Sequence, residues 1–391
     1  MYKILTLNNI SVVGLERFPR DGYEVASDMS APDAIILRSY KMHDMDIPGS
    51  VKAIGRAGAG TNNIPVAQMS SRGVPVFNAP GANANAVKEL VLAGLLLAAR
   101  NIAPALDFVR RLEGDDKAMH LAVEAGKKKF VGFELPGRSL GVIGLGAIGV
   151  KVANAALEMG MEVWGFDPAM TVNNAWKLDA RVRQAVSVDD LMTRSQFVSV
   201  HVPLLEVTRG LINAERLGLM HGQGVILNFA RDAIVDQRAI LEALDTQRLH
   251  AYVCDFPSPA LHGHPRVIAT PHLGASTREA EDNCAVMVAE QLREFLERGN
   301  ITNSVNFPDA VLPLQPGQTR LAISNANVPN MVGQISTTLA RHRLNIADLL
   351  NKSRADIAYT LVDVDSPVPQ AAVDEIARIQ GVLNVRVIPG G

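Results

Sequence analysis

The stretch LGVIGLGAIGVKVANAALEMGMEVWGFD, residues 140–167, carries the strongest signal for the fold. It runs from an apolar strand through a glycine-rich turn and a helix-periodic segment into a second apolar strand, which ends at Asp167. The turn, GLGAIG at 144–149, fits G-x-G-x-x-G and opens the helix, as a dinucleotide-binding βαβ unit requires. These residues predict a site for a dinucleotide cofactor.

Each glycine of this turn has a separate task. Gly144 permits the tight turn, Gly146 lets backbone N–H groups approach a pyrophosphate, and Gly149 lets the helix pack closely. The positive end of the helix dipole favours the phosphates. Asp167 would accept hydrogen bonds from ribose hydroxyls and repel a 2′-phosphate, so we predict NAD rather than NADP as the cofactor.

The composition is that of a globular protein with large cores. The chain has 391 residues, enough for two or three domains, and 48% of them are hydrophobic against 20% charged. A formal net charge of −2 gives no electrostatic reason to expect a nucleic-acid or membrane partner. The N-terminus lacks a signal-peptide pattern, and the most apolar run, 90–99, is too short to cross a bilayer. We therefore expect a soluble, cytoplasmic protein that acts on small molecules.

Apolar runs alternate with helix-periodic segments, which predicts an α/β fold with two doubly wound, Rossmann-like parallel sheets. The expected strands are 2–7, 33–39, 51–58, 140–143, 161–167, 197–203, 224–230 and 249–255, and the expected long helices are 86–100, 150–160 and 279–298. The first two strands are apolar on both faces, which predicts places near the centre of a sheet. Beyond Gly299, the proline-containing segment 304–319 is typical of a linker. From Arg320 a β-α-β-β-α-β order predicts a small ferredoxin-like α+β domain.

Two further segments supply a catalytic pair. NFARDAIVD (228–236) places Arg231 just after an apolar strand, at the edge where open α/β sheets bind ligands. TPHLGAST (270–277) places His272 in a loop directly before a long helix. A 2-hydroxy acid needs a cation for its carboxylate and a base for its hydroxyl proton while hydride leaves C2. Guanidinium and imidazole suit these two tasks.

Together these segments resemble the D-2-hydroxyacid dehydrogenase family and, within it, the enzymes that act on D-3-phosphoglycerate. The resemblance covers essentially the whole chain and rests on GRAGAGTNNI (55–64), GLGAIG with Asp167, HVPLLEVTRGLI (201–212), NFARDAIVD and PHLGAST. It implies NAD-dependent oxidation of D-3-phosphoglycerate to 3-phosphohydroxypyruvate, the first step of L-serine biosynthesis. Two alternatives stay open: a dehydrogenase for another 2-hydroxy acid, such as hydroxypyruvate or glyoxylate, and a non-catalytic NAD-sensing protein on the same fold.

The resemblance also implies the domain organisation. A discontinuous substrate-binding domain (1–95 and 285–305) would flank an NAD-binding domain (96–284), followed by a linker (306–318) and an ACT-like domain (319–391). Subunit contacts through the helix that begins near Ala86 and through paired ACT-like domains imply a homodimer or homotetramer.

The family's functional residues map onto this chain motif by motif. Arg231 would hold the substrate carboxylate and carbonyl, and His272 would be the proton donor for reduction. The residues implied in NAD binding are Gly144, Gly146, Ala147, Ile148, Gly149, Asp167, Val202, Pro203, Phe229, Ala230, Arg231, Asp255, His272, Gly274 and Ala275. Those implied in substrate binding are Gly58, Ala59 and Gly60 through their backbone, Arg38 and Arg56 for the phosphate, and Lys128 or Lys129 from a neighbouring subunit. For the two lysines, a solvated basic loop is an equal alternative.

One family residue is missing. In the family, a glutamate five residues after the aspartate matched by Asp255 pairs with the catalytic histidine, but here that position is Ala260. No Asp or Glu lies between Asp255 and Glu279. Three explanations stay open: another acid (Asp232, Asp236 or Glu279) orients His272, a backbone carbonyl or water does so, or the chain is a catalytically weak NAD-binding relative.

The same region contains residue types that bind metals. Cys254, His262 and His264 lie close to His272 in the sequence and could ligate zinc. Adjacent strand residues point to opposite faces, so Cys254 faces the packed side if Asp255 faces the cofactor. We therefore expect no metal, and the two cysteines of the chain predict no disulfide framework.

The C-terminal unit resembles an ACT domain, an amino-acid-sensing module. In the dehydrogenases that carry one, it binds L-serine between paired domains and inhibits the enzyme. The loop NANVPN (325–330) and the segment LNIAD match the family, so Asn325, Asn327 and Asn345 are the implied serine ligands. An ACT-like domain that serves only dimerisation is the alternative.

Overall fold

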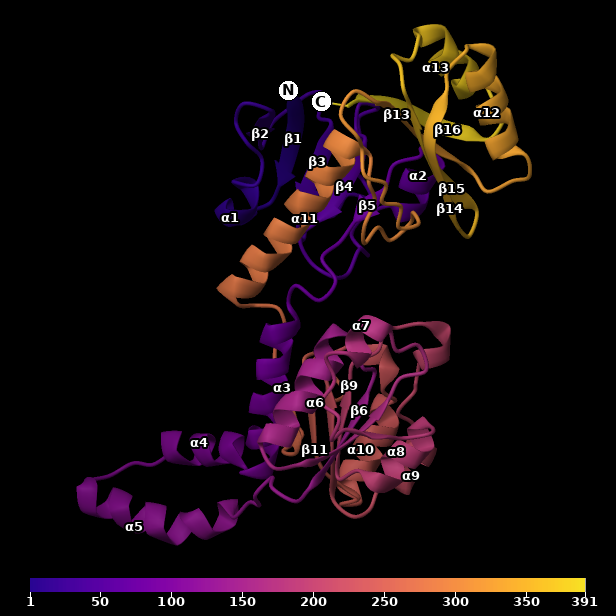
Figure 1. Cartoon of the computed structure of the whole chain (residues 1–391). Helices are drawn as coiled ribbons and strands as arrows, with labels where there is room; N and C mark the ends of the chain where they lie inside the picture. The colour runs from indigo at the N-terminus through magenta and orange to yellow at the C-terminus, as the bar shows by residue number, and fades with distance from the viewer. Residues whose placement is uncertain (391) are drawn as a thin grey trace. The chain divides into compact units, whose positions relative to one another are not determined.

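The computed structural model describes residues 1–390, which form two compact units (Figure 1). Unit 1 combines Met1–Asn83 with the chain from Arg278 onward, and unit 2 is Ala84–Thr277. The chain passes from one unit to the other twice, each time at the start of a long helix: α3 (Ala84–Ala99) and α11 (Arg278–Arg298). The boundaries expected from the sequence, after residues 95 and 284, would instead have divided these helices between two units.

Unit 2 is built on a seven-stranded sheet in the order β12-β11-β10-β9-β6-β7-β8. Every pair of neighbouring strands is parallel, so all seven strands end at the same edge. The strands are β6 (Ser139–Ile143), β7 (Glu162–Phe166), β8 (Arg183–Gln184), β9 (Phe197–Val200), β10 (Gly224–Asn228), β11 (Leu249–Cys254) and β12 (Val267–Ala269). The strand order reverses between β6 and β9, where sheets of this kind bind ligands.

Both faces of this sheet are covered, as the doubly wound prediction requires. On one face Val142 and Leu227 share a core with α3 and α6 (Ala147–Glu158). On the other, Ile143 and Ile226 pack in a core with α8 (Val188–Arg194), α9 (Ala214–Leu219) and α10 (Gln237–Asp245). Successive strand residues thus enter opposite cores. Unit 2 also contains the short helix α7 (Val172–Ala175) and single turns at Lys127–Phe130, Glu206–Thr208 and Asp232–Ile234.

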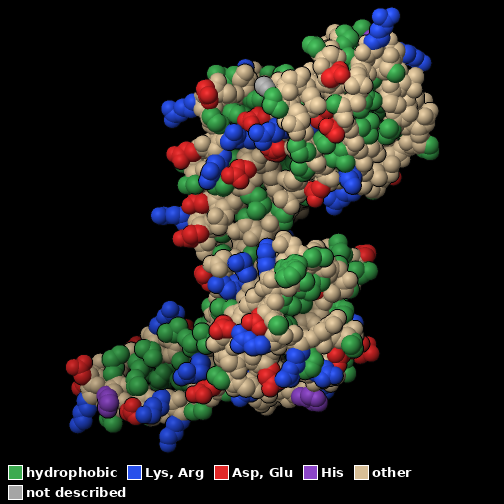
Figure 2. All heavy atoms as spheres, viewed as in Figure 1, with side chains coloured by type: hydrophobic (Ala, Val, Ile, Leu, Met, Phe, Trp, Pro, Cys, Tyr) green, Lys and Arg blue, Asp and Glu red, His purple; other side chains and the backbone are tan. Residues whose placement is uncertain are grey.

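Helices α4 (Ile102–Arg110) and α5 (Asp116–Gly126) stand away from the sheet of unit 2 as an arm (Figure 1). They are not among the helices expected from the sequence. No residue of α4 is buried, and α5 buries only Gly126. Apolar side chains gather on this arm (Figure 2), and the exposed ones are Leu106, Val109, Met119, Leu121 and Val123. Among residues 1–390 no single helix is long and apolar enough to cross a membrane; α3 and α4 meet that test only as a pair bent by 70°.

Unit 1 begins with a five-stranded parallel sheet in the order β2-β1-β3-β4-β5. The strands are β1 (Tyr2–Leu7), β2 (Tyr23–Ala26), β3 (Ala34–Leu37), β4 (Ala53–Arg56) and β5 (Val76–Phe77), accompanied by α1 (Val12–Leu15) and α2 (Val66–Ser71). β1 and β3 lie inside the sheet, as their apolar composition predicts. Helix α11 packs against β4, where a Cβ on Gly55 would come within 2.3 Å of Val288.

The C-terminal part of unit 1 is an antiparallel sheet in the order β14-β15-β13-β16. Its elements are β13 (Thr319–Ala326), α12 (Met331–Arg341), β14 (Ile346–Arg354), β15 (Ile357–Val364), α13 (Gln370–Ala377) and β16 (Val382–Pro389). One face buries Ile323 beneath α12 and α13. The other face contributes Tyr359 and Leu361 to the same core as Phe77 and Phe295 of the first sheet and α11. The two sheets of unit 1 therefore share a core.

Side chains of the C-terminal sheet satisfy the last carbonyls of α11. Arg386 donates to the carbonyls of Phe295 and Leu296 at 3.2 and 2.9 Å. Tyr359 Oη donates to the Gly299 carbonyl at 2.6 Å. A helix end leaves four carbonyls without intrahelical partners, so these bonds act as its cap. Positive charge at this end also suits the helix dipole.

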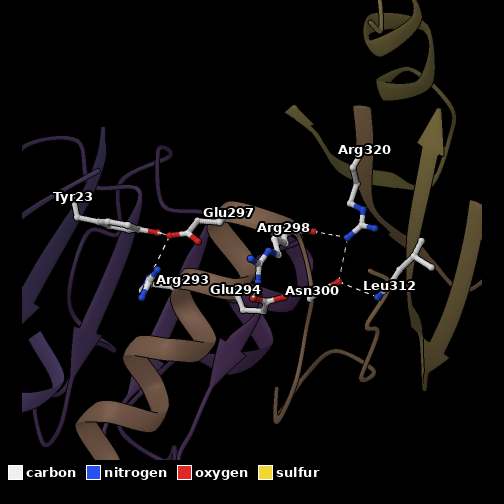
Figure 3. Close-up of polar contacts among 8 residues, drawn as sticks. All are labelled: Tyr23, Arg293, Glu294, Glu297, Arg298, Asn300, Leu312 and Arg320. Atoms are coloured by element: carbon white, nitrogen blue, oxygen red, sulfur yellow. Dashed lines mark hydrogen bonds and ion pairs between the residues drawn. The ribbon is translucent and has the colours of Figure 1, made fainter. Parts of the chain in front are cut away.

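Arg320 completes this cap from β13. Its Nη1 donates to the Arg298 carbonyl at 2.8 Å and to Asn300 Oδ1 at 3.2 Å (Figure 3). Its other nitrogens form a bidentate pair with Asp363, 2.6 Å for each bond, and both side chains are fully buried. Each nitrogen of the Arg320 guanidinium therefore donates a hydrogen bond, and the two bonds to Asp363 are charge-assisted.

The segment 304–319, expected as a linker, is packed into unit 1. Val305 N–H donates to the Val76 carbonyl at 2.9 Å beside β5. Phe307 is fully buried and meets Tyr359 edge-on, with ring centroids 6.0 Å apart. The prolines interrupt the helical and strand periodicity of this segment in the sequence. Its burial depends on tertiary contacts, which a periodic pattern does not report.

We predict that Arg320→Ala lowers the free energy of unfolding by about 3–5 kcal/mol, because the substitution leaves the buried Asp363 carboxylate without its partner. Arg341→Ala is the matched control: it breaks an exposed pair with Glu375 and should cost less than about 1 kcal/mol. Urea unfolding of both variants measures the difference. Equal costs would contradict the prediction.

Candidate active site

The cofactor and catalytic residues predicted for unit 2 follow the carboxyl ends of neighbouring strands. Because the strands are parallel, these ends share one edge of the sheet. In the order of the sheet, the residues that follow β7, β6, β9, β10, β11 and β12 include Asp167, Gly144, Val202, Arg231, Asp255 and His272, respectively. The structure therefore brings the predicted cofactor residues and the catalytic pair to one edge.

The glycine-rich turn has the geometry that its sequence predicts. Gly144 adopts φ +92°, and its N–H donates to the Phe166 carbonyl at 2.8 Å. A Cβ on Gly149 would lie 1.8 Å from the Gly144 carbonyl oxygen, so only glycine lets α6 approach β6 this closely. A Cβ on Gly146, at the N-cap of α6, would meet nothing within 4 Å. Open space thus lies over the helix N-terminus, which fits a pyrophosphate.

Asp167 is oriented by the backbone around it. Its Oδ2 accepts from Leu145 N–H and its Oδ1 from Ala169 N–H, each at 2.8 Å. A carboxylate has about four acceptor positions, so both oxygens can still accept from ribose hydroxyls.

Arg231 is held by a residue that the sequence analysis did not identify, Asn228. This side chain is fully buried; its Oδ1 accepts from Ala230 N–H at 3.1 Å and its Nδ2 donates to the Arg231 carbonyl at 2.8 Å. The Arg231 side chain is exposed and donates to the Ala230 carbonyl at 2.6 Å, and no ion pair is formed to it within the described residues. The sequence signal that could have identified Asn228 is its position, as an asparagine, at the end of an apolar strand.

The loop that carries His272 is tied to Asp255, which is 1% exposed. Asp255 Oδ1 accepts from Thr270 Oγ1 and from Leu273 N–H, and Oδ2 accepts from Gly274 N–H, each at 2.7 Å. The His272 N–H donates to the Asp255 carbonyl at 3.1 Å. His272 itself has φ +57°, a left-handed conformation that a non-glycine residue adopts only when its surroundings fix it.

None of the acids of unit 2 named in the sequence analysis contacts the His272 imidazole. The Asp236 carboxylate caps α10 by accepting from Arg238 and Ala239 N–H groups. Asp232 lies exposed on the turn after Arg231, and Glu279 belongs to unit 1. No hydrogen bond reaches the imidazole from residues 84–277. Its contact in this unit is the ring of Phe256, with centroids 5.1 Å apart and planes at 58°.

Cys254, His262 and His264, the candidate metal ligands near His272 in the sequence, lie in different surroundings. Cys254 is fully buried in the core, with Sγ 3.8 Å from the Phe256 carbonyl. His264 lies 3.4 Å from Asp245, and His262 is exposed. Within the part of the chain that the structure describes, no three or more His, Cys, Asp and Glu side chains gather as a metal ligand set.

The predicted substrate residues of unit 1 lie at the carboxyl ends of β3 and β4. Arg56 Nε donates to the Arg38 carbonyl at 3.1 Å, and Arg38 pairs with Glu281 of α11 at 2.7 Å. Gly58, at φ +157°, passes close to the Arg56 guanidinium. Asn78, which the sequence analysis missed, donates to the Ala59 carbonyl at 2.5 Å and fixes the loop that includes Gly60.

Lys128 and Lys129 do not join Arg231 and His272 within one chain. Both are exposed on the turn after α5. Lys129 lines a cavity of about 790 Å³ with Gln223 and His250, which lie at the amino ends of β10 and β11. That is the edge of the sheet opposite the catalytic pair.

The three predicted effector asparagines are also not together in one chain. Asn325 and Asn327 line a cavity of about 150 Å³ with Asn330 and Asn351. Asn345 directly precedes β14, and the first residue of that strand, Ile346, pairs with Val364 at the end of β15. The Asn345 side chain donates to Asp365 Oδ2 at 2.9 Å. Asn325 pairs with Ala358, at the other end of β15.

Comparisons with known proteins agree with this geometry. Residues 93–274 match the D-isomer specific 2-hydroxyacid dehydrogenase, NAD binding domain. The chain is 32% identical over 347 residues to the D-3-phosphoglycerate dehydrogenase of Haemophilus influenzae, covering 86% of this chain and 81% of that protein. The chain belongs to the D-isomer specific 2-hydroxyacid dehydrogenase family.

Other family members resemble the chain over comparable lengths. The D-3-phosphoglycerate dehydrogenase of Dictyostelium discoideum is 27% identical, over 99% of this chain and 97% of that one. The crystal structure of NAD⁺-bound 3-phosphoglycerate dehydrogenase from Entamoeba histolytica matches with a TM-score of 0.60 and 26% identity, over 78% of this chain and 98% of that chain. The chain is therefore an NAD-dependent dehydrogenase with the α/β fold of this family and an additional small C-terminal antiparallel sheet.

Substitutions at the second and third glycines of the turn, Gly146 and Gly149, should cause different defects. Gly149→Ala should lower the unfolding free energy of the apo-protein by about 1–3 kcal/mol, because its Cβ overlaps the Gly144 carbonyl. Gly146→Ala should change stability by less than about 1 kcal/mol but weaken NADH binding, because its Cβ enters the open space above α6. Thermal unfolding without cofactor and NADH fluorescence titration separate the two effects. Destabilisation by Gly146→Ala equal to that by Gly149→Ala would contradict this account.

His201, at the carboxyl end of β9, makes stability depend on pH. Burial lowers the pKa of His201 from 6.5 to about 4, and its Nε2 lies 2.8 Å from Ser199 Oγ. The neutral imidazole is therefore favoured in the fold, and its contribution to stability is lost as the pH falls from 6.5 towards 4. His201→Asn should flatten the pH dependence of the unfolding free energy in this window, whereas exposed His221→Asn should not. Identical pH profiles of the unfolding free energy for wild type and His201→Asn would contradict this prediction.

Proposed function

We propose that the enzyme oxidises D-3-phosphoglycerate to 3-phosphohydroxypyruvate, the first step of L-serine biosynthesis. The observation that carries this proposal is the row of groups from Asp167 to His272 at one sheet edge, in a chain similar to enzymes named for that substrate. An exposed guanidinium and an exposed imidazole follow strands that lie either side of β11 in this row.

In the proposed reaction Arg231 binds the substrate carboxylate. Its guanidinium has five N–H donors in a planar fork, and its one hydrogen bond in the structure leaves donors for a carboxylate. Asn228 holds the backbone from which the side chain extends, so the charge is positioned before substrate binds.

His272 is the proposed base. During oxidation its neutral imidazole takes the proton of the C2 hydroxyl, and during reduction the imidazolium returns it. NAD, when bound, supplies the acceptor for the C2 hydride. Asp167 would hold the ribose hydroxyls and Gly144, Gly146 and Gly149 the pyrophosphate, with the other residues named from the family motifs along the same edge.

Arg38 and Arg56 are the proposed ligands of the substrate phosphate. The Arg56 side chain donates to the backbone carbonyl of Arg38, and both residues lie at the carboxyl ends of neighbouring strands, close in sequence to the Gly58 to Gly60 loop. Glu281 pairs with Arg38 at 2.7 Å and would compete with a phosphate for this guanidinium. Lys128 and Lys129 remain candidates only through a neighbouring subunit.

The C-terminal domain is proposed to be ACT-like and to bind L-serine. Its β-α-β-β-α-β order and the cavity beside Asn325 and Asn327 support this proposal. Since Asn345 lies at the other end of the sheet, a site that uses all three asparagines requires a second chain, which agrees with a homodimer or homotetramer.

We predict that His272→Gln lowers kcat for NADH-dependent reduction of 3-phosphohydroxypyruvate by about 100-fold or more. Arg231→Lys should lower kcat/KM by about 10- to 100-fold, because lysine cannot reproduce the planar fork. His262→Gln and Arg238→Lys, exposed residues of the same unit, are the controls and should leave both constants within about twofold. Repeating the wild-type assay with L-serine tests the effector proposal separately.

Full activity of His272→Gln would exclude the proposed base. NADH binding without turnover of any 2-oxo acid by the wild type would favour the non-catalytic alternative. Turnover that L-serine does not change would leave the enzyme and reject the effector.

A further inference from the structure

The histidine proposed above as the base lacks the family's glutamate, since that position is Ala260, and its imidazole contacts an aromatic ring. Ala260 is exposed and carries no acid, and Asp236 is engaged as a helix cap. The contact of the imidazole within residues 84–277 is the half-buried ring of Phe256, at 5.1 Å between centroids and 58° between planes. A tilted pair of this separation is an attractive aromatic geometry.

Phe256 is itself well placed to set the ring orientation. It follows Asp255 directly at the end of β11, so its backbone starts from a buried, hydrogen-bonded position. Asp255 also holds His272 from the other side: its carbonyl accepts from His272 N–H, and its carboxylate accepts from the two backbone N–H groups that follow. One dipeptide, Asp255–Phe256, therefore fixes the backbone of the histidine and contacts its ring.

We propose that Phe256 is a positioning residue that replaces the missing carboxylate in orienting the His272 imidazole. The ring contact restricts the imidazole torsion angle without using either ring nitrogen. Both nitrogens then stay available for the proton of the substrate hydroxyl and for water. A carboxylate partner would instead occupy one nitrogen and fix the tautomer.

This inference rests on the proposed role of His272, and it makes a specific kinetic prediction. A residue that aligns the base without touching substrate affects the chemical step more than substrate binding. Phe256→Leu should therefore lower kcat about tenfold, while KM for 3-phosphohydroxypyruvate and the Kd for NADH stay within about twofold. Phe256→Tyr retains the ring and should keep kcat within about twofold of wild type.

The chain offers a matched control. Phe133 and His250 form a second phenylalanine–histidine contact in unit 2, with centroids 5.3 Å apart, and they lie away from the carboxyl edge of the sheet. Phe133→Leu removes a comparable ring contact and should leave kcat unchanged apart from any loss of folded protein. Phe256→Met, which keeps most of the volume but no ring, serves as a second ring-less variant if Phe256→Leu does not fold.

The experiment is a steady-state comparison of these variants in the full-length enzyme, with NADH fluorescence titration as the measure of an intact cofactor site. A kcat defect in Leu and Met that Tyr restores, with KM and NADH affinity unchanged, supports the proposal. Wild-type kcat in Phe256→Leu, equal defects in Leu and Tyr, or a defect confined to KM overturns it. His272→Gln in the same series tests the proposed base separately from the role of Phe256. If that variant is fully active, His272 is not the base, whatever the Phe256 variants show.

Discussion

The buried carboxylate of Asp255 is the interaction on which the candidate active site depends. A charge that is 1% exposed must be satisfied by donors, and three of them come from the segment Thr270–Gly274. These bonds fold the chain back over the end of β11 and hold His272 in its left-handed conformation. His272 is thus placed by the desolvation cost of a neighbouring charge. This arrangement explains how the loop can be ordered without a carboxylate on the imidazole itself.

A second buried charge organises unit 1. Arg320 joins Asp363 to the end of α11, where Arg386 and Tyr359 bind the carbonyls of Phe295, Leu296 and Gly299. α11 begins immediately after the loop of His272 in the sequence and covers the first sheet of unit 1. The C-terminal sheet therefore stabilises the helix against which the five-stranded sheet of unit 1 packs. Its role in the fold is separate from any ligand that it binds.

The sequence predicted the parts of the protein whose chemistry is local. GLGAIG and Asp167 encode a turn, a helix start and an acceptor within one βαβ unit, and strand composition placed β1 and β3 inside their sheet. Asn228 and Asn78 were missed because their amides bond to backbone of adjacent loops, which leaves no periodic signal. The arm of α4 and α5 was missed because it packs on little of its own unit.

The separation of Asn325 and Asn327 from Asn345 follows from strand register rather than from motif spacing. Roles for Arg231 and His272 remain the central claim, with phosphate recognition as its most specific part. The most direct measurement is the kcat/KM of the wild-type enzyme for 3-phosphohydroxypyruvate compared with hydroxypyruvate, each with NADH. The account predicts a preference of about 10-fold or more for the phosphorylated substrate, because charged hydrogen bonds to a phosphate contribute about 1.5–3 kcal/mol each. Equal values, or a preference for hydroxypyruvate, would contradict it.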